Sequence, residues 1–386
     1  MHLSESLNNF AAKITPFGMK KITFDAALLS HNTFGMNVKA AVLAEYDTVS
    51  ELREILADPI IADLMLAEKD KGHLPFWHIG SGSNLLFTGD YPGVVLHSLA
   101  KGISRITNDD VSADNIDGVC QLKVEAGTLW DDVSAYCAEN GFYGPENLSL
   151  IPGEMGAAAV QNIGAYGMEI SKLIEEVICW DVEADKEHRF RSDEMGYGYR
   201  ESRLKHAADK ARFIVTSVIL RVQRARKLHL EYAGIKRALG IENVSETDLA
   251  ASNSPTLQEV RDAVIRIREG KLPDPKVIGN AGSFFKNPVV DNSVFNPILA
   301  QYPDMPHYVI DANHTKIPAG WMIEQCGWKG KDLGRAGVYE KQSLVLVNRG
   351  GARPEEIVRL CQTIIDDVEK KFGIRIEPEV NLIEGR

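Results

Sequence analysis

The segment between Val177 and Ser192 constrains the fold of this chain more than any other. Two strand-like runs, Val177–Glu183 and His188–Ser192, flank the short polar stretch Ala-Asp-Lys-Glu, and this pattern predicts a β-hairpin. A further strong strand is predicted over Phe213–Val222. Hairpins join antiparallel strands, so a chain that combines them with helices favours an α+β fold over a doubly wound parallel sheet.

Helical and strand patterns cover much of the remaining chain. Apolar residues at helical spacing predict helices that begin at Thr48 and near Ile60, and further helices at Thr128–Asn140, Thr256–Glu269, Pro318–Cys326 and Pro354–Phe372. Glycines that commonly end helices stand just past three of them, at Gly141, Gly270 and Gly373. Shorter runs predict strands at Phe76–Ile79, Val94–Leu99, Gln121–Ala126 and Ile374–Ile383.

Length and charge set the class of protein. A chain of 386 residues exceeds what one core usually serves, so we expect two or three domains, with the main boundary in the polar region near 235–250. The formal net charge of −11 argues against nucleic-acid binding and against a membrane partner, because repulsion would have to be overcome locally. An anionic ligand still fits if a few lysines and arginines gather in one cleft.

The cysteines indicate a reducing compartment. All five are scattered and none forms a CxxC pair, so we expect reduced thiols in a cytoplasmic protein and no metal site. The chain contains no apolar run of membrane-spanning length.

The segment from Gly279 to Pro288, Gly-Asn-Ala-Gly-Ser-Phe-Phe-Lys-Asn-Pro, carries the strongest functional signal. Its two glycines leave the backbone free to approach a ligand, and a hydroxyl, an amine and two amides stand together beside a Phe-Phe anchor. The alternative is a plain hairpin corner with Ser283 as a turn residue.

Two further segments are rich in small residues. Gly80-Ser81-Gly82-Ser83-Asn84 follows a predicted strand and suits a diphosphate cradle, although such loops are more often plain turns. The apolar run Leu85-Leu86-Phe87 continues from it, so no helix opens there as a Rossmann fingerprint requires. Ile151–Gly167 would let a flat cofactor lie against backbone, or would let a helix pack closely on a sheet.

Arg200 stands in the aromatic segment Gly-Tyr-Gly-Tyr-Arg-Glu-Ser. Its planar fork suits a carboxylate, whereas most arginines are surface residues. The same alternative applies to Tyr232 and Lys271, and Glu379 could merely cap a strand edge.

Taken together, these segments resemble the UDP-N-acetylenolpyruvoylglucosamine reductases, also called UDP-N-acetylmuramate dehydrogenases. The likeness runs in order from about residue 32 to 383 through GSGSNLLF, IPGEMGAAAVQNIGAYG, GYRES, KLPDPKV, GNAGSFFKNPVV, AGWMIEQCG and EPEV. Within the family, the chain resembles the form that has a tyrosine-bearing loop, in which the tyrosine here is Tyr232. One departure is Ala157-Ala158-Ala159, where many relatives have a proline.

The resemblance implies a fold and a domain plan. It implies an α+β, PCMH-type FAD-binding domain over residues 24–240, with two lobes at about 24–90 and 91–240, after an N-terminal extension over residues 1–23. A C-terminal substrate-binding domain would cover residues 241–386. It also implies FAD, NADPH as co-substrate and a UDP-sugar substrate, and we expect a monomer. Because the glycine loop contains no histidine, we expect FAD to be bound non-covalently.

The resemblance also assigns the site residues. Arg200 and Glu379 would sit at the substrate carboxylate and Ser283 would donate the proton. The sugar nucleotide would contact Tyr199, Tyr232, Lys271 and Asn287. FAD would be held by Gly80, Ser81, Gly82, Ser83, Asn84, Pro152, Gly153, Gly156, Ala157, Asn162, Gly164, Ala165 and Tyr166.

The implied reaction reduces an enol ether conjugated to a carboxylate, in peptidoglycan precursor synthesis. Added hydride pushes negative charge toward the carboxylate, so Arg200 would stabilise charge that grows during the step. Glu379 must then carry a raised pKa or share a proton, since an ionised carboxylate would repel the substrate. The alternatives are a sugar or alcohol oxidase of the same flavin fold and a catalytically silent binding protein.

Overall fold

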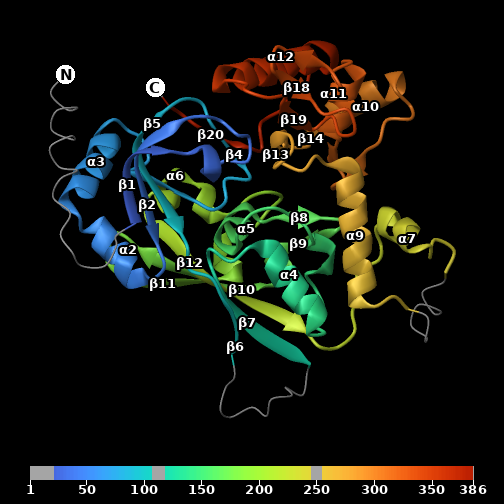
Figure 1. Ribbon diagram of the computed structural model, residues 1–386. Helices are drawn as coiled ribbons and strands as arrows, with labels where there is room; N and C mark the ends of the chain where they lie inside the picture. The colour runs from blue at the N-terminus through green and yellow to red at the C-terminus, as the bar shows by residue number, and fades with distance from the viewer. Residues whose placement is uncertain (1–20, 107–117, 245–253, 386) are drawn as a thin grey trace.

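The computed structural model describes residues 21–106, 118–244 and 254–385, arranged as two sheet-based lobes below a C-terminal part (Figure 1). The α+β prediction is confirmed, since antiparallel strand pairs and helices occur together in all three. The cores also mix residues from different parts, so the three are packed as one body. None of the helices in these ranges is long and apolar enough to cross a membrane.

The first lobe contains a four-stranded sheet of mixed direction. Its strand order is β1 (Lys21–Ala27), β2 (Lys39–Tyr46), β5 (Tyr91–Ser98) and β3 (Phe76–Ile79), with β5 parallel to both of its neighbours. Both faces of the sheet are buried. Val94 and Leu96 pack under the helices α2 (Val49–Leu56) and α3 (Pro59–Asp70), while Val95 between them faces the core shared with the C-terminal part.

The first sheet begins and ends at residues other than the predicted domain and lobe boundaries. Residues 1–20 of the predicted extension lie outside the described residues, and residues 21–23 already belong to β1. The lobe boundary expected near residue 90 falls just before β5, which completes the first sheet, so the sheets themselves divide after Ser98.

The second lobe is a five-stranded antiparallel sheet that contains the predicted hairpin. β10 (Ile174–Asp181) and β11 (Lys186–Arg191) pair antiparallel, which confirms the hairpin, and the order continues through β12 (Phe213–Gln223), β7 (Val119–Glu125) and β6 (Ile103–Ile106). Asp181 fixes the turn by accepting from the backbone amides of Glu183 and Ala184, at 3.1 Å each.

Short elements connect this sheet to its surroundings. The helices are α4 (Trp130–Glu139), α5 (Met155–Gln161), α6 (Ala207–Lys210) and α7 (Ala233–Leu239). A two-residue ladder joins β8 (Gly164–Ala165) to β9 (Met168–Glu169). Single 3-10 turns lie at Leu29–His31, Glu146–Leu148, Ile170–Lys172, Ser192–Met195 and Arg203–Lys205.

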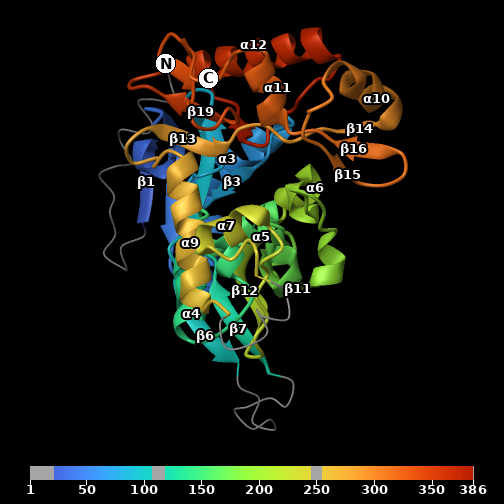
Figure 2. The same ribbon diagram turned by 90° about the vertical axis from the view of Figure 1, so that its right-hand side faces the viewer.

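The long helix α9 (Leu257–Lys271) leads from the second lobe to the C-terminal part, as both views show (Figures 1 and 2). Thr256 caps its first turn in a capping box with Glu259, as the sequence pattern suggests. Arg261 donates to both carboxylate oxygens of Asp131 on α4, at 2.7 and 2.8 Å, and anchors the helix to the second lobe. The predicted end before Gly270 is wrong, because the helix continues through that glycine to Lys271.

The C-terminal part contains a four-stranded and a three-stranded sheet. The first has the order β13 (Gly279–Ser283), β19 (Val345–Asn348), β18 (Ala336–Val338) and β17 (Asp332–Leu333). The second has the order β14 (Val289–Asp291), β16 (His314–Lys316) and β15 (Tyr308–Val309). The helices are α10 (Asn292–Gln301), α11 (Ala319–Gln325) and α12 (Pro354–Phe372).

The chain returns to the first lobe near its end. β20 (Asn381–Ile383) pairs in parallel with β4 (Leu85–Phe87), directly after the glycine loop. The strand predicted over Ile374–Ile383 is therefore too long. Ile374 and Ile376 alternate and are buried in the core, but only the last three residues join a ladder, and Glu379 precedes it.

Candidate active site

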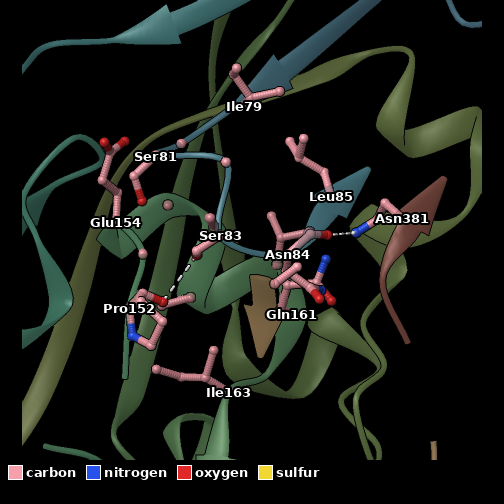
Figure 3. Close-up of a pocket in the computed structure, with 18 of the residues that line it drawn as sticks. Ile79, Ser81, Ser83, Asn84, Leu85, Pro152, Glu154, Gln161, Ile163 and Asn381 are labelled. Atoms are coloured by element: carbon pink, nitrogen blue, oxygen red, sulfur yellow. Dashed lines mark hydrogen bonds between the residues drawn. The ribbon is translucent and has the colours of Figure 1, made fainter. Parts of the chain in front are cut away.

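A cavity of about 250 Å³ opens where the two lobes and the C-terminal part meet. Of the twenty positions predicted to bind ligands or act in catalysis, thirteen line this cavity, and they come from distant segments of the chain. The glycine loop, the segment around α5, Arg200, Ser283 and Glu379 all contribute to its wall. Figure 3 shows the part of this wall that is formed by the glycine loop and by the segment from Pro152 to Ile163.

The glycine loop, Gly80–Asn84, lies between β3 and β4 with all five residues on the cavity. Gly82 has a φ of +70°, and a Cβ there would clash with the backbone carbonyl of His31. A Cβ at Gly80 would stand 3.1 Å from Oε2 of Glu154. The loop therefore needs glycine for close packing, and Ser83 Oγ donates to the carbonyl of Pro152 at 3.2 Å.

The small residues before and within α5 form the facing wall. Pro152, Gly153, Gly156, Ala157 and Gly164 all line the cavity, as predicted for cofactor contacts. The close-packing alternative applies to Gly156, because a Cβ there would lie 3.1 Å from that of Ala126. The cofactor contacts of this segment stay a prediction.

Three residues predicted to contact the cofactor do not line the cavity. Asn162 is fully buried with a φ of 44°, and its side chain donates to the carbonyl of Gly198 at 2.8 Å and accepts from the amide of Ser171 at 3.1 Å. Ala165 belongs to the small β8–β9 ladder. Tyr166 stacks edge-on against Tyr232, with ring centroids 5.2 Å apart. Asn162 is thus occupied in shaping the backbone around the cavity.

Arg200 and Glu379 meet in the cavity as an ion pair. Arg200 Nε lies 2.7 Å from Oε1 of Glu379, and the guanidinium also donates to the carbonyls of Gly164 at 2.6 Å and Asn162 at 3.3 Å. Burial raises the pKa of Glu379, although the cations Arg200, Lys205 and Lys286 oppose that rise. The direction agrees with the raised pKa expected for this carboxyl group.

Ser283 is held at the cavity by the sheet and by the Phe-Phe anchor. It ends β13 opposite Val345, and the two phenylalanines after it are buried. The amide of Phe284 donates to the carbonyl of Leu344 at 2.7 Å, and the amide of Glu379 donates to the carbonyl of Phe284 at the same distance. These bonds fix Ser283 and Glu379 relative to each other.

The four predicted sugar-nucleotide contacts lie outside the cavity wall. Asn287 donates to the hydroxyl of Tyr199 at 3.4 Å and accepts from the amide of Ala319 at 2.9 Å. Tyr232 precedes α7 and is 41% exposed, while Lys271 is exposed at the end of α9. The structure therefore brings Tyr199 and Asn287 together, while the ring of Tyr232 contacts Tyr166.

Three cations in the cavity were not singled out from the sequence. Burial lowers the pKa of Lys205 and of Arg268, and lowers that of Lys210 to about 8, while Lys210 Nζ lies 3.7 Å from the centroid of the Trp77 ring. Lys205 stands five residues after Arg200, which was a usable signal. Together with Arg200 they give an acidic chain a cationic pocket suited to an anionic ligand.

Family comparisons agree with this geometry. Residues 274–383 match the family described as UDP-N-acetylenolpyruvoylglucosamine reductase, C-terminal domain, and residues 61–181 match the FAD binding domain. A reductase of that name from Bacteroides fragilis is 47% identical over 359 residues, which cover 92% of this chain and 98% of the relative. The chain belongs to the UDP-N-acetylenolpyruvoylglucosamine reductase family. It is accordingly an oxidoreductase.

Other family members give the same result. The reductase of Porphyromonas gingivalis is 42% identical over 93% of this chain and 98% of its own length, and that of Burkholderia ambifaria is 38% identical over 92% and 95%. The solved structure of the Thermus caldophilus reductase matches with a TM-score of 0.57 at 20% identity, covering 95% of this chain and all of that one. That structure supports the fold.

The cavity fits the FAD that the family fold implies. One residue of its wall, Gln161, has a buried side-chain oxygen, Oε1, that has no hydrogen-bond partner among the described residues. Buried polar atoms are nearly always paired, so an unpaired acceptor in a cavity wall fits a ligand that supplies a donor. The glycine loop and the cations supply backbone approach and positive charge for a diphosphate.

Proposed function

We propose that this chain is an NADPH-dependent flavoenzyme that reduces the enolpyruvyl ether of UDP-N-acetylglucosamine-enolpyruvate to UDP-N-acetylmuramate. The observation that carries the proposal is the meeting of Arg200, Ser283 and Glu379, from three distant segments, in the cavity lined by the glycine loop. These residues could bind an unsaturated carboxylate, stabilise the negative charge that grows on it, and donate a proton to it.

FAD would be held non-covalently by Gly80–Asn84 and by the backbone around Pro152, Gly153, Gly156 and Ala157. When bound, it would take hydride from NADPH and deliver hydride to the substrate. Gln161 Oε1 would accept a hydrogen bond from a donor at its polar edge.

Arg200 and Glu379 would bind the substrate carboxylate. A second carboxylate beside this buried ion pair is tolerable only if Glu379 takes up a proton, which its raised pKa favours. Protonated Glu379 would donate to the substrate carboxylate, and the Arg200 cation would stabilise the charge that grows there as hydride arrives. The backbone carbonyls of Asn162 and Gly164 would hold the guanidinium in place.

Ser283 would complete the reaction by donating its Oγ proton to the carbon next to the carboxylate. A serine is a weak acid, but the carbanion it meets is a strong base. The charge left on Oγ would lie near the cations Lys205 and Arg200, which line the same cavity.

The sugar nucleotide would extend from the cavity toward the surface. Tyr199 and Asn287 lie together, and the exposed Tyr232 and Lys271 stand just before α7 and at the end of α9. We propose that all four contact it, with the two exposed residues reaching its outer end. NADPH rather than NADH, a monomeric state and a cytoplasmic location stay predictions.

An anaerobic titration tests the proposed function. Purified protein should be yellow, lose the flavin colour with NADPH, and regain it when the enolpyruvyl sugar nucleotide is added, with one product formed per flavin. Reoxidation by a simple alcohol-derived ketone, or no reoxidation by the sugar nucleotide, would contradict the proposal.

A further inference from the structure

Three metal-ligand side chains meet behind the glycine loop, outside the cavity. Glu45 Oε1 lies 3.0 Å from His97 Nδ1 and 3.5 Å from His31 Nε2, and the three ligand atoms lie within 4.8 Å of one another. Glu45 and His97 are direct partners in the parallel ladder between β2 and β5, and His31 ends the 3-10 turn at Leu29–His31. The fold therefore brings them together through backbone pairing.

The outward nitrogen of each imidazole has a polar partner of its own. His97 Nε2 lies 3.2 Å from Oε1 of Glu154, and His31 Nδ1 lies 3.1 Å from Oγ of Ser30. Histidines that bind metals usually donate their other ring N–H to a carboxylate or a similar oxygen, which turns the remaining lone pair inward. With Nε2–H of His97 donated to Glu154, its Nδ1 faces the Glu45 carboxylate at 3.0 Å, and either a second ring proton or a metal cation must lie between them.

We propose that His31, Glu45 and His97 bind a divalent transition metal, best matched by Zn²⁺. Two imidazoles and one carboxylate suit zinc, whose bonds of about 2.0–2.2 Å hold tetrahedral ligand atoms about 3.3–3.5 Å apart. The observed separations of 3.0 and 3.5 Å bracket that spacing. The side chains are 18%, 25% and 11% exposed, so water can reach the remaining coordination position.

A metal here would brace the cofactor loop without entering the cavity. The backbone carbonyl of His31 packs against Gly82, and Glu154, which holds His97, packs against Gly80. Figure 3 shows Glu154 beside Ser81 of the same loop. None of the three ligands lines the cavity, so the metal would act on the rigidity of the loop and take no part in the hydride or proton steps.

Metal analysis of the flavin-loaded protein tests this proposal independently of turnover. Protein stripped with a chelator and then dialysed against Zn²⁺ should retain one zinc per chain by mass spectrometry, and its melting temperature should rise on zinc addition. His31→Gln, Glu45→Gln and His97→Gln should each lose the zinc and the rise. Glu154→Gln should keep the stoichiometry at saturation but bind about 10–100-fold more weakly.

His314→Gln is the matched control, because His314 is an exposed histidine that lies 2.9 Å from Asp311 and 3.5 Å from Asp291. It should leave zinc uptake unchanged. Wild-type protein that takes up no stoichiometric zinc would overturn the proposal and leave a proton-bridged hydrogen-bond network. Zinc that persists in all three ligand variants would place the metal elsewhere, for example on a cysteine. Wild-type uptake decides the first question even if a variant fails to fold.

Discussion

Arg200 Nε lies 2.7 Å from Oε1 of Glu379, and this contact joins the second lobe to the segment that enters β20. Arg200 also has a φ of 55°, a left-handed backbone that costs of order 1–3 kcal/mol for a residue other than glycine. The guanidinium is thus aimed by its backbone, by two carbonyls and by one carboxylate, which is the pre-organisation that a charge-stabilising group requires.

Replacing Arg200 with lysine should damage one half-reaction far more than the other. A lysine keeps the charge but cannot bond Glu379, two carbonyls and a substrate carboxylate at once. We expect flavin reoxidation by the sugar nucleotide to fall about 10²–10³-fold in stopped-flow measurements, with NADPH-driven reduction much less affected. Arg203→Lys, which alters an arginine paired with Asp209, should leave both steps near wild type. Equal loss in both half-reactions of Arg200→Lys would instead assign the residue to flavin binding.

Ser283→Ala should retain FAD and its reduction by NADPH while losing product formation. Loss of a general acid typically costs about 10²–10⁴ in rate. Single-turnover product analysis measures this step directly, and Ser283→Cys should recover part of it because a thiol can also donate a proton. Turnover of the alanine variant within about tenfold of wild type would rule out the proton-donor role.

Tyr232 should order its loop when the sugar nucleotide binds. Its ring is 41% exposed and rests on Tyr166, at the start of α7. Tyr232→Phe should weaken product-nucleotide binding by about 1.5–3 kcal/mol, the value of one charge-assisted hydrogen bond, as measured by calorimetry. Tyr308→Phe, at another exposed tyrosine, should have no effect on binding.

Hydrogen exchange over residues 228–238 gives a second readout for the same loop. Added product nucleotide should protect these amides in wild type. Unchanged exchange would make Tyr232 a packing residue.

The Asp181–Arg212 pair at the turn of the β10–β11 hairpin should make the free energy of unfolding depend on pH in the acid range. Arg212 donates to both oxygens of the buried Asp181 carboxylate, at 2.8 and 2.6 Å, and lowers its pKa from 3.8 to about 2. A depressed folded-state pKa stabilises the fold above the ordinary pKa, and that stability is lost as the pH falls through the folded value. Asp181→Asn should therefore cost about 1–3 kcal/mol at neutral pH, and the difference from wild type should shrink between about pH 4 and pH 2.

Chemical denaturation at several pH values measures that difference. Asp185→Asn is the control, because Asp185 lies in the same turn but forms an exposed pair with Arg53. A pH-independent cost for Asp181→Asn would mean that the side chain acts through its turn hydrogen bonds and not through its charge.

Local signals in the sequence were sufficient for many elements. Helix α12 begins at Pro354 and ends before Gly373, as the pattern predicts, and Gly373 has the left-handed conformation. Proline suits the first turn of a helix and glycine the position after its last turn because of their own backbone preferences, so these ends depend on no distant partner. Local patterns failed where an element depends on pairing with a distant segment. Ile374 and Ile376 alternate with exposed residues like a strand, yet they pack into the core and lie before β20, the strand that pairs with β4.

The same distinction applies to the cavity. Arg200, Ser283 and Glu379 were found through the resemblance to a family, and they do meet. Asn162 illustrates what sequence cannot show: an amide beside small residues could face a ligand or the protein backbone, and here the fold turns it inward. Arg268 reaches the cavity only because α9 packs on the second lobe, a contact between segments more than a hundred residues apart.

The pairing of β20 with β4 also sets an order of events during synthesis. Asn381 donates through its backbone and side-chain N–H groups to the carbonyl of Asn84, across 297 residues of chain. At about 5–20 residues per second, a ribosome needs roughly 15–60 s to make that interval. For that time the glycine loop is already outside the ribosome without the strand that closes it, and its apolar neighbours Leu85–Phe87 form an unpaired edge. The cofactor pocket is therefore completed only after Asn381 has been made, and that exposed edge is where we expect chaperones to act before then.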